Sequence, residues 1–431
     1  MGAALILVTC SINIYAISRD RKLEVIVGGL YLGFSLVALF SYDFISAFIA
    51  LELMMISATI IIFIGKQESS IASAKSYLFT HLFSGSLILV GISYIFTTSN
   101  SIQMINLVHM IDQPQYSNIF YYLLLLGCLI NVAAFPFSSW VINCYPSASS
   151  SGFIYLNLFT TKISIILIIK LFWGLGLLKY FGAAMIVYGN IYACIEDNNR
   201  RVSCYLAISQ LGLILIGISI GTKLSILGVI SYLVVYITYK SLLALVFAVL
   251  LDEGAIENCS QLKIIKSLPS NISIWVSFLT MLNLPVSITF VSKAFLYNDL
   301  EHNAIKYLIQ VTSIIIFLSL PFKKLLYNKQ SIQIKTNKYI FVSLALLVSI
   351  LVVSNYCIIY NYQFLSKSRI VTDFSDKIVK QAITIIIGIA LAIFISLPRI
   401  DSRKFNIDIL VMSAQAVKFF YSLYLRIISI L

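Results

Sequence analysis

Long apolar segments, separated by short polar ones, make up almost the whole chain. An α-helix needs roughly 20 mostly apolar residues to cross the hydrocarbon core of a bilayer. The pattern therefore predicts an all-α polytopic membrane protein with about 12–14 transmembrane helices. The predicted spans are residues 1–17, 24–42, 44–65, 76–96, 119–136, 153–173, 180–195, 203–221, 225–250, 270–298, 307–322, 339–361, 379–398 and 406–430.

Composition supports this prediction. Hydrophobic residues make up 60% of the 431 residues and charged residues only 11%, whereas soluble proteins carry about 25% charged residues. The net charge of +13 is explained by Lys and Arg in cytoplasmic loops, so nucleic acid is not an expected partner. The seven cysteines are scattered, without a CxxC pair or a glycine-rich nucleotide motif, so we expect no cofactor and no metal on this chain.

The basic residues predict an orientation. If residues 19–22 are cytoplasmic, alternation also places 66–75, 196–202, 251–269, 323–338 and 399–405 there, and each of these loops contains Lys or Arg. The loop 97–118 contains neither and falls outside, as the positive-inside rule requires. Two loops depart from the rule, because 137–152 lacks a basic residue and 362–378 has three.

Four charged residues interrupt apolar segments: Glu52, Lys162, Lys240 and Lys293. A charge at mid-membrane costs about 2.5–3.5 kcal/mol on insertion scales. Low dielectric disfavours the charged form of such a group and a nearby opposite charge restores it, so a set of them can pass protons. The alternative is that each side chain snorkels or is structural. For His81, a polar role at a helix interface is the favoured interpretation.

Two predicted helices are interrupted by proline, at Pro136 in NVAAFPFSSW and at Pro285 in LNLPVSITF. Broken helices at corresponding positions of two halves are typical of inverted repeats in transporters. We therefore predict a single membrane domain with two inverted five-helix repeats, at 24–173 and 180–322, and additional C-terminal helices over 339–431.

Several segments match, in order, the motifs of one family. SYDFISAFIALELMMIS has Asp43 and Glu52 at the spacing of GD-x-F-x-x-F-x-x-x-E, and TTKISIILIIK has Lys162 at the lysine of K-x-G-x-Y. NNRRVSCYLAISQLG is similar to D-I-K-R-x-x-A-Y-S-S-I-S-Q-x-G, VVYITYKSLLALVF to H-x-x-x-K-x-x-L-F, and NLPVSITFVSK to G-x-P-P-x-x-G-F-x-x-K. Over about residues 1–300 the chain thus resembles the antiporter-like membrane subunits of respiratory complex I and of Mrp-type multisubunit Na⁺/H⁺ antiporters.

The resemblance implies a function. Glu52, Lys162, Lys240 and Lys293 would form a proton relay, with Glu52 as the electrostatic partner of Lys162. The chain would be the D-type subunit of an Na⁺/H⁺ antiporter, preferred because residues 75–109 look closer to that subunit. It would move protons and Na⁺ beside other membrane subunits in the lipid bilayer of a bacterial inner (cytoplasmic) membrane.

Two alternatives stay open. One is an antiporter-like proton-pumping subunit of NADH-quinone oxidoreductase (complex I), and the other is a diverged scaffold paralogue without transport. The family's lysine before the first broken helix is Asn131 here, which cannot titrate, and its histidine before Lys240 is Tyr236. The resemblance also places residues 1–17 at the family's third helix.

Overall fold

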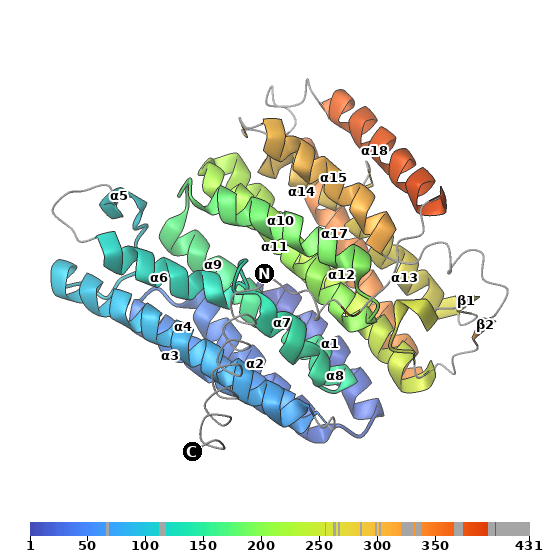
Figure 1. The fold of residues 1–431 in the computed structure, drawn as a ribbon, viewed down its shortest axis with the longest axis horizontal. Coiled ribbons are helices and arrows are strands. Elements are labelled where there is room, and N and C mark those ends of the chain that lie inside the picture. The colour runs from blue at the N-terminus through green and yellow to red at the C-terminus, as the bar shows by residue number, and fades with distance from the viewer. Residues whose placement is uncertain are drawn as a thin grey trace, which may run out of the picture.

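The computed structural model of the protein is almost entirely helical (Figure 1). It describes residues 1–65, 69–111, 118–254, 256–261, 264–265, 268–284, 287–297, 300, 303–319, 331–332, 338–365, 374–394 and 401. The prediction of an all-α membrane fold is confirmed. The strands that it describes, β1 (Ile264–Ile265) and β2 (Ser331–Ile332), form one short parallel pair.

The helices of the N-terminal part are α1 (Gly2–Ser18), α2 (Lys22–Phe40), α3 (Phe44–Ile64), α4 (Ser70–Ser99), α5 (Val108–Ile111), α6 (Asn118–Asn131), α7 (Ser139–Cys144), the 3₁₀ turn η1 (Tyr145–Ser147), α8 (Ser150–Leu156) and α9 (Thr160–Phe172). Those that follow are α10 (Leu178–Ile195), α11 (Asn199–Ile220), α12 (Lys223–Gly254), η2 (Cys259–Gln261), α13 (Leu268–Met281), α14 (Ile288–Leu296), α15 (Asn303–Ser319), α17 (Lys338–Leu365) and α18 (Phe374–Phe394). The predicted span 406–430 lies outside the described residues.

Seven helical segments in the described part are long and apolar enough to cross a membrane. They are Lys22–Phe40, Phe44–Ile64, Ser70–Ser99, Ser150–Phe172, Leu178–Ile195, Asn199–Ile220 and Lys223–Gly254, and shorter apolar helices accompany them. The total of 12–14 spans therefore remains a prediction.

Helices α11 and α12 lie at the centre of the molecule (Figure 1), and nearly all of their residues are buried. They are apolar on every face, as a helix surrounded by other helices must be. Helices α2 to α4, in blue, form one flank, and α15 and α18, in orange and red, form the other. The exposed positions of the flanking helices are large apolar side chains, among them Ile26, Ile49, Phe79 and Ile386, as expected of surfaces that face lipid.

Local signals place the helix ends. The carboxylate of Asp43 begins α3 by accepting a hydrogen bond from the Ser46 backbone N–H at 2.7 Å. Asn198 begins α11 in the same way, accepting from the N–H groups of Arg200 and Arg201. Such N-caps satisfy backbone donors that the helix itself cannot. Gly221 ends α11 in the left-handed conformation at φ 74°, where glycine avoids a steric penalty.

Three helices are interrupted. Between α6 and α7 the chain leaves the helix at Asn131 and passes Pro136. A second interruption, between Met281 and Ile288, separates α13 from α14; Pro285 itself lies outside the described residues. The third, at residues 157–159 between α8 and α9, falls inside the predicted span 153–173 and differs from the continuous helix expected there.

Candidate functional site

Three of the four predicted charges are lysines that the helices bury completely. The exposed fractions of Lys162, Lys240 and Lys293 are 1%, 1% and 7%. Among the residues that the structure describes, none of the three forms an ion pair with a carboxylate, because the five ion pairs found there involve other residues. Within the described residues, neutral oxygens and aromatic rings are the groups that stabilise their charges.

The interruption between α8 and α9 creates the site of Lys162. It leaves the carbonyl of Asn157 without a continuing helix, and the Lys162 amine donates to that carbonyl and to Thr161 Oγ1, the latter at 3.1 Å. The amine also lies 4.9 Å from the ring centroid of Tyr236. Lys162 is the third residue of α9, and the positive end of a helix dipole disfavours a cation there. The oxygens therefore stabilise the charged amine of Lys162, and the helix dipole destabilises it.

Lys240 and Lys293 have different surroundings. The Lys240 amine donates to the backbone carbonyl of Ser203 and to its hydroxyl, at 2.6 Å from the hydroxyl. The Lys293 amine has no hydrogen-bond partner in the described part of the chain and lies 5.4 Å from the ring centroid of Tyr232. A cation over an aromatic face gains roughly 2 kcal/mol when it is desolvated, which offsets only part of the burial cost.

Tyrosines of α12 connect the three lysines. Tyr232 and Tyr236 stack with ring centroids 6.3 Å apart, and Tyr236 and Tyr239 lie 5.6 Å apart. The hydroxyls of Tyr232 and Tyr239 are 3.3 Å apart. Because Tyr232 faces Lys293 and Tyr236 faces Lys162, this buried face of α12 runs from one lysine to the next, with Lys240 on the same helix.

Sequence reasoning missed this tyrosine face. In the sequence Tyr236 stands out only as the replacement of a histidine, since tyrosine is ordinary in an apolar segment. The available signal was spacing: Tyr232, Tyr236 and Lys240 recur every four residues, which places them along one side of a helix.

Glu52 does not lie where it was predicted. It is half-buried between α3 and α4, and its carboxylate lies against Gly85, where an added Cβ would collide with it. The expected ion pair between Glu52 and Lys162 is absent from the described part of the structure, because Lys162 bonds to Asn157 and Thr161 instead.

Asn131 is buried and is part of a polar cluster. Its Oδ1 lies 2.8 Å from His81 Nδ1 and 2.7 Å from Ser84 Oγ, both on α4. Asn131 cannot titrate, but it contacts a histidine, which can.

Comparison with known proteins agrees with this architecture. Residues 41–319 match the family described as "NADH:quinone oxidoreductase/Mrp antiporter, TM". The chain belongs to this family. It is an antiporter-like membrane subunit of Mrp or complex I type, and it is an integral membrane protein.

The curated relatives of this antiporter-like protein are of both types. The chain is 28% identical over 283 residues to "NADH-quinone oxidoreductase subunit N" of Leptospira interrogans serogroup Icterohaemorrhagiae serovar Lai (strain 56601), covering 61% of this chain and 54% of the relative. It is 25% identical over 218 residues to the D-type subunit of the Na(+)/H(+) antiporter of Alkalihalophilus pseudofirmus (strain ATCC BAA-2126 / JCM 17055 / OF4), covering 47% and 44%. The chain thus spans about half the length of the curated relatives it matches.

The fold is shared with a solved multisubunit complex. A chain of "Structure of Mrp complex from Dietzia sp. DQ12-45-1b" superposes with a TM-score of 0.72 at 16% identity, covering 88% of this chain and 84% of that one. This likeness shows that the two chains share a fold.

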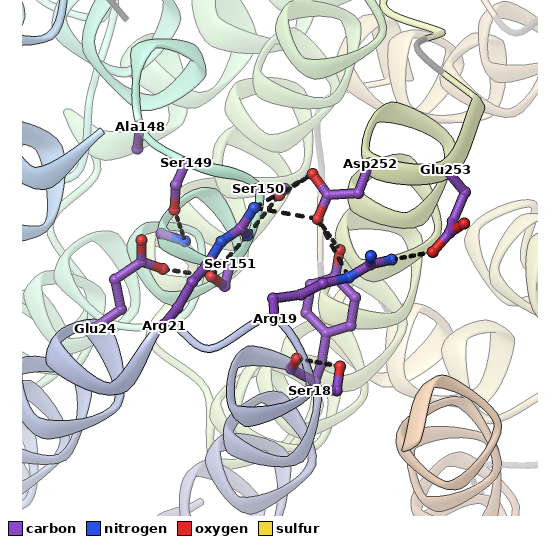
Figure 2. A network of polar contacts seen from close by, with 12 residues as sticks. Ser18, Arg19, Arg21, Glu24, Ala148, Ser149, Ser150, Ser151, Asp252 and Glu253 are labelled. Atoms are coloured by element: carbon purple, nitrogen blue, oxygen red, sulfur yellow. Dashed lines mark hydrogen bonds and ion pairs between the residues drawn. The ribbon is translucent and has the colours of Figure 1, made fainter. Parts of the chain in front are cut away.

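A second polar region of this antiporter-like protein lies at one end of the helices (Figure 2). Arg21 donates to Ser150 and Ser151 and pairs with Asp252 at 3.2 Å. Arg19 pairs with Glu253 at 2.5 Å, while Tyr15 and Ser150 both donate to Asp252. We call this set the end network; its members are Tyr15, Arg19, Arg21, Glu24, Ser150, Ser151, Asp252 and Glu253.

The end network borders a cavity of about 480 Å³ that Arg200 also lines. It brings together residues of the loops at 19–22, 196–202 and 251–269, which the orientation argument placed on one side of the membrane, with Ala148, Ser149 and Ser150 of the loop at 137–152, which departed from the rule. The buried Glu24, which accepts a hydrogen bond from Ser151, was not expected, because it stands at the end of an apolar segment where charges are common.

Proposed function

We propose that this chain translocates protons, coupled to Na⁺, as the D-type subunit of a multisubunit Na⁺/H⁺ antiporter in a bacterial cytoplasmic membrane. The observation that carries the proposal is the row of buried lysines, which have no carboxylate partner in the part of the chain that the structure describes and are joined by the tyrosine face of α12. In this proposal Lys162, Lys240 and Lys293 carry the proton, and Glu52 supplies it from the flank.

The relay works through the cost of burying charge. Each lysine amine can hold its proton, because carbonyls, hydroxyls or a tyrosine face stabilise the cation. Each can also lose it, because no carboxylate is left unpaired when the amine becomes neutral. Lys162 contacts the tyrosine face of α12, Lys240 lies on the same helix, and two like charges in such buried surroundings disfavour each other. A proton arriving on one therefore favours release from the other, and the charge moves along the row.

Matching helix lengths support the two inverted repeats that this proposal includes. In the first set α2, α3, α4 and α6 have 19, 21, 30 and 14 residues. In the second set α10, α11, α12 and α13 have 18, 22, 32 and 14 residues. The helix before each interruption is followed, two residues after its end, by a residue with positive φ, Ala133 and Asn283.

The second candidate is a proton-pumping membrane subunit of NADH-quinone oxidoreductase. It is favoured by the longer match and higher identity to the oxidoreductase relative than to the antiporter relative. In that case the proton row would be driven by a redox reaction elsewhere in the complex, and Na⁺ would not be required.

The test uses inside-out membrane vesicles that contain the whole complex, with a fluorescent ΔpH indicator. Proton movement that begins on adding Na⁺ supports the antiporter, and movement that begins on adding NADH supports the oxidoreductase. In either system Lys162→Arg should abolish the movement, because a guanidinium does not deprotonate in proteins. Wild-type proton movement in an assembled Lys162→Arg complex would reject the relay and favour the scaffold alternative.

A further inference from the structure

One buried face of α4 runs from Glu52 towards Lys162. Its members are Tyr77, His81, Ser84 and Gly85; His81 follows Tyr77 by four residues, and Ser84 and Gly85 follow His81 by three and four, so they lie along one side of the helix. All four are buried or packed against neighbouring helices. Glu52 of α3 contacts this face at Gly85, and Tyr77 contacts Thr160 of α9 at its other end.

His81, in the middle of this face, has one ring nitrogen occupied and one free. Its Nδ1 lies 2.8 Å from Asn131 Oδ1, which can only accept and also receives the Ser84 hydroxyl. Nδ1 therefore carries the hydrogen of the neutral ring, and the lone pair is on Nε2. Nε2 has no hydrogen-bond partner in the part of the chain that the structure describes, although only 4% of the side chain is exposed.

A purely structural histidine would not be placed this way. Leaving a buried polar atom unpaired costs about 1–3 kcal/mol, and an apolar side chain at position 81 would avoid that cost. The arrangement instead leaves a base whose lone pair is available to a proton, held in one tautomer by Asn131.

His81 is joined to Lys162 by a ring contact, a hydrogen bond and one step along the chain, from Thr160 to Thr161. The His81 ring packs on Tyr77 with centroids 4.2 Å apart, and the Tyr77 hydroxyl lies 3.1 Å from Thr160 Oγ1. Thr160 precedes Thr161, whose hydroxyl accepts from the Lys162 amine. Trp140 closes the other side of the ring, at 4.5 Å between centroids.

We propose that His81 is the proton-carrying residue that links Glu52 with Lys162, an inference that rests on the proposed function. A proton leaves the carboxylic acid of Glu52, which becomes a carboxylate, and binds at His81 Nε2, which makes the ring a cation. The ring then passes one proton to the neutral amine of Lys162 and returns to the neutral Nδ1–H tautomer. No bond other than those to the proton changes.

The position of His81 in the fold supports this role independently. The proposed repeats make α4 the counterpart of α12, so each third helix carries one buried nitrogen base, His81 on one and Lys240 on the other. The titratable side chains on the elements that pack around the His81 face are Glu52 on α3, Tyr77 on α4, Cys128 on α6, Cys144 on α7 and Tyr145 on η1.

The first experiment measures proton movement in vesicles of the whole complex for His81→Gln and for the control His109→Gln. His109 is exposed on the short helix α5. Glutamine keeps a donor for Asn131 but cannot titrate, so we expect proton movement to fall about a hundredfold in His81→Gln and to stay unchanged in His109→Gln. Wild-type movement in His81→Gln, with Lys162→Arg inactive, would overturn this inference and leave the proposed function standing.

The second experiment observes the His81 ring in the unmutated complex. Solid-state NMR of the unmutated complex with ¹⁵N-labelled histidine follows ring signals between about pH 5 and 8, and the His81 signal is the one missing from His81→Gln. Burial disfavours the cation, so we expect a neutral ring with its hydrogen on Nδ1 over most of this range. A ring with its hydrogen on Nε2 instead would overturn the proposal, because Nε2 could then not accept a proton.

Discussion

The buried lysines and the end network use the same side-chain chemistry in opposite ways. In the end network Arg19 and Arg21 pair with Asp252 and Glu253, at distances between 2.5 and 3.7 Å. Around Lys162, Lys240 and Lys293 the described residues include no paired carboxylate, and Lys293 has no hydrogen bond at all among them. The arginines of the end network are thus paired with carboxylates, whereas the three central lysines have no carboxylate partner among the described residues.

This difference predicts which substitutions change the stability of the fold and which change proton movement. A paired and hydrogen-bonded charge holds its protonation state and connects the loops that carry it. A single buried lysine destabilises the fold while it is charged, and that cost is what lets it give up a proton. Substitutions in the end network should therefore change stability, and substitutions in the lysine row should change proton movement.

The largest effect is expected for Lys293→Met. Methionine fills a similar volume without a charge, so the complex should unfold at the same or a higher temperature, because an unpaired buried cation is removed. Proton movement in vesicles should fall about a hundredfold. The control Lys223→Met, at an exposed position at the start of α12, should change neither quantity. A less stable complex with normal proton movement would contradict the comparison.

Asp252→Ala should produce the opposite result. It removes the acceptor that Tyr15, Ser150 and Arg21 share, so the free energy of unfolding should fall by about 2 kcal/mol. Proton movement per assembled complex should remain near that of the unmutated protein.

Asp20 provides the matched control for Asp252. It pairs with Lys22 at 3.6 Å, but their side chains are 86% and 83% exposed, and such surface pairs contribute little. Asp20→Ala should therefore leave the unfolding temperature unchanged. Equal losses in the two variants would show that the end network is no more stabilising than a surface pair.

A smaller effect is expected at Asp43, which begins α3. Hydrogen bonds from Ser46 hold the pKa of its carboxyl below the ordinary value of 3.8. The cap is therefore fully formed above that value and is lost as the pH falls through the lowered pKa. Asp43→Ala should cost about 1 kcal/mol at neutral pH, while Asp43→Asn keeps an acceptor and should cost less. Thermal unfolding at neutral and acid pH checks both, and an equal cost in the two variants would reject the cap.

Hydropathy predicted which charged residues are buried better than it predicted which neighbour each side chain faces. Lys162, Lys240 and Lys293 could be recognised because a single charge in an apolar segment is conspicuous, and burying them is the only inexpensive arrangement. Glu52 was expected to face Lys162, yet it lies against Gly85. Helix α3 is apolar on nearly all sides, so its pattern does not define its rotation about its own axis.

The long-range contacts and one helix interruption could not be predicted from the sequence. The break at residues 157–159 contains neither proline nor glycine, so no local signal predicts it. It nevertheless frees the carbonyl that accepts a hydrogen bond from Lys162. The contact of His81 with Asn131 joins two residues of different helices that are 50 positions apart in the sequence. Such pairs depend on how helices pack, which a single sequence does not specify.

The most direct test of the account exchanges one basic residue for another in each region. Lys240→Arg keeps a cation in the lysine row but prevents its deprotonation, and Arg21→Lys keeps a cation in the end network. Proton movement per assembled complex, measured in vesicles, should be abolished by Lys240→Arg and preserved by Arg21→Lys. Full proton movement in an assembled Lys240→Arg complex would contradict the claim that single buried lysines carry the proton.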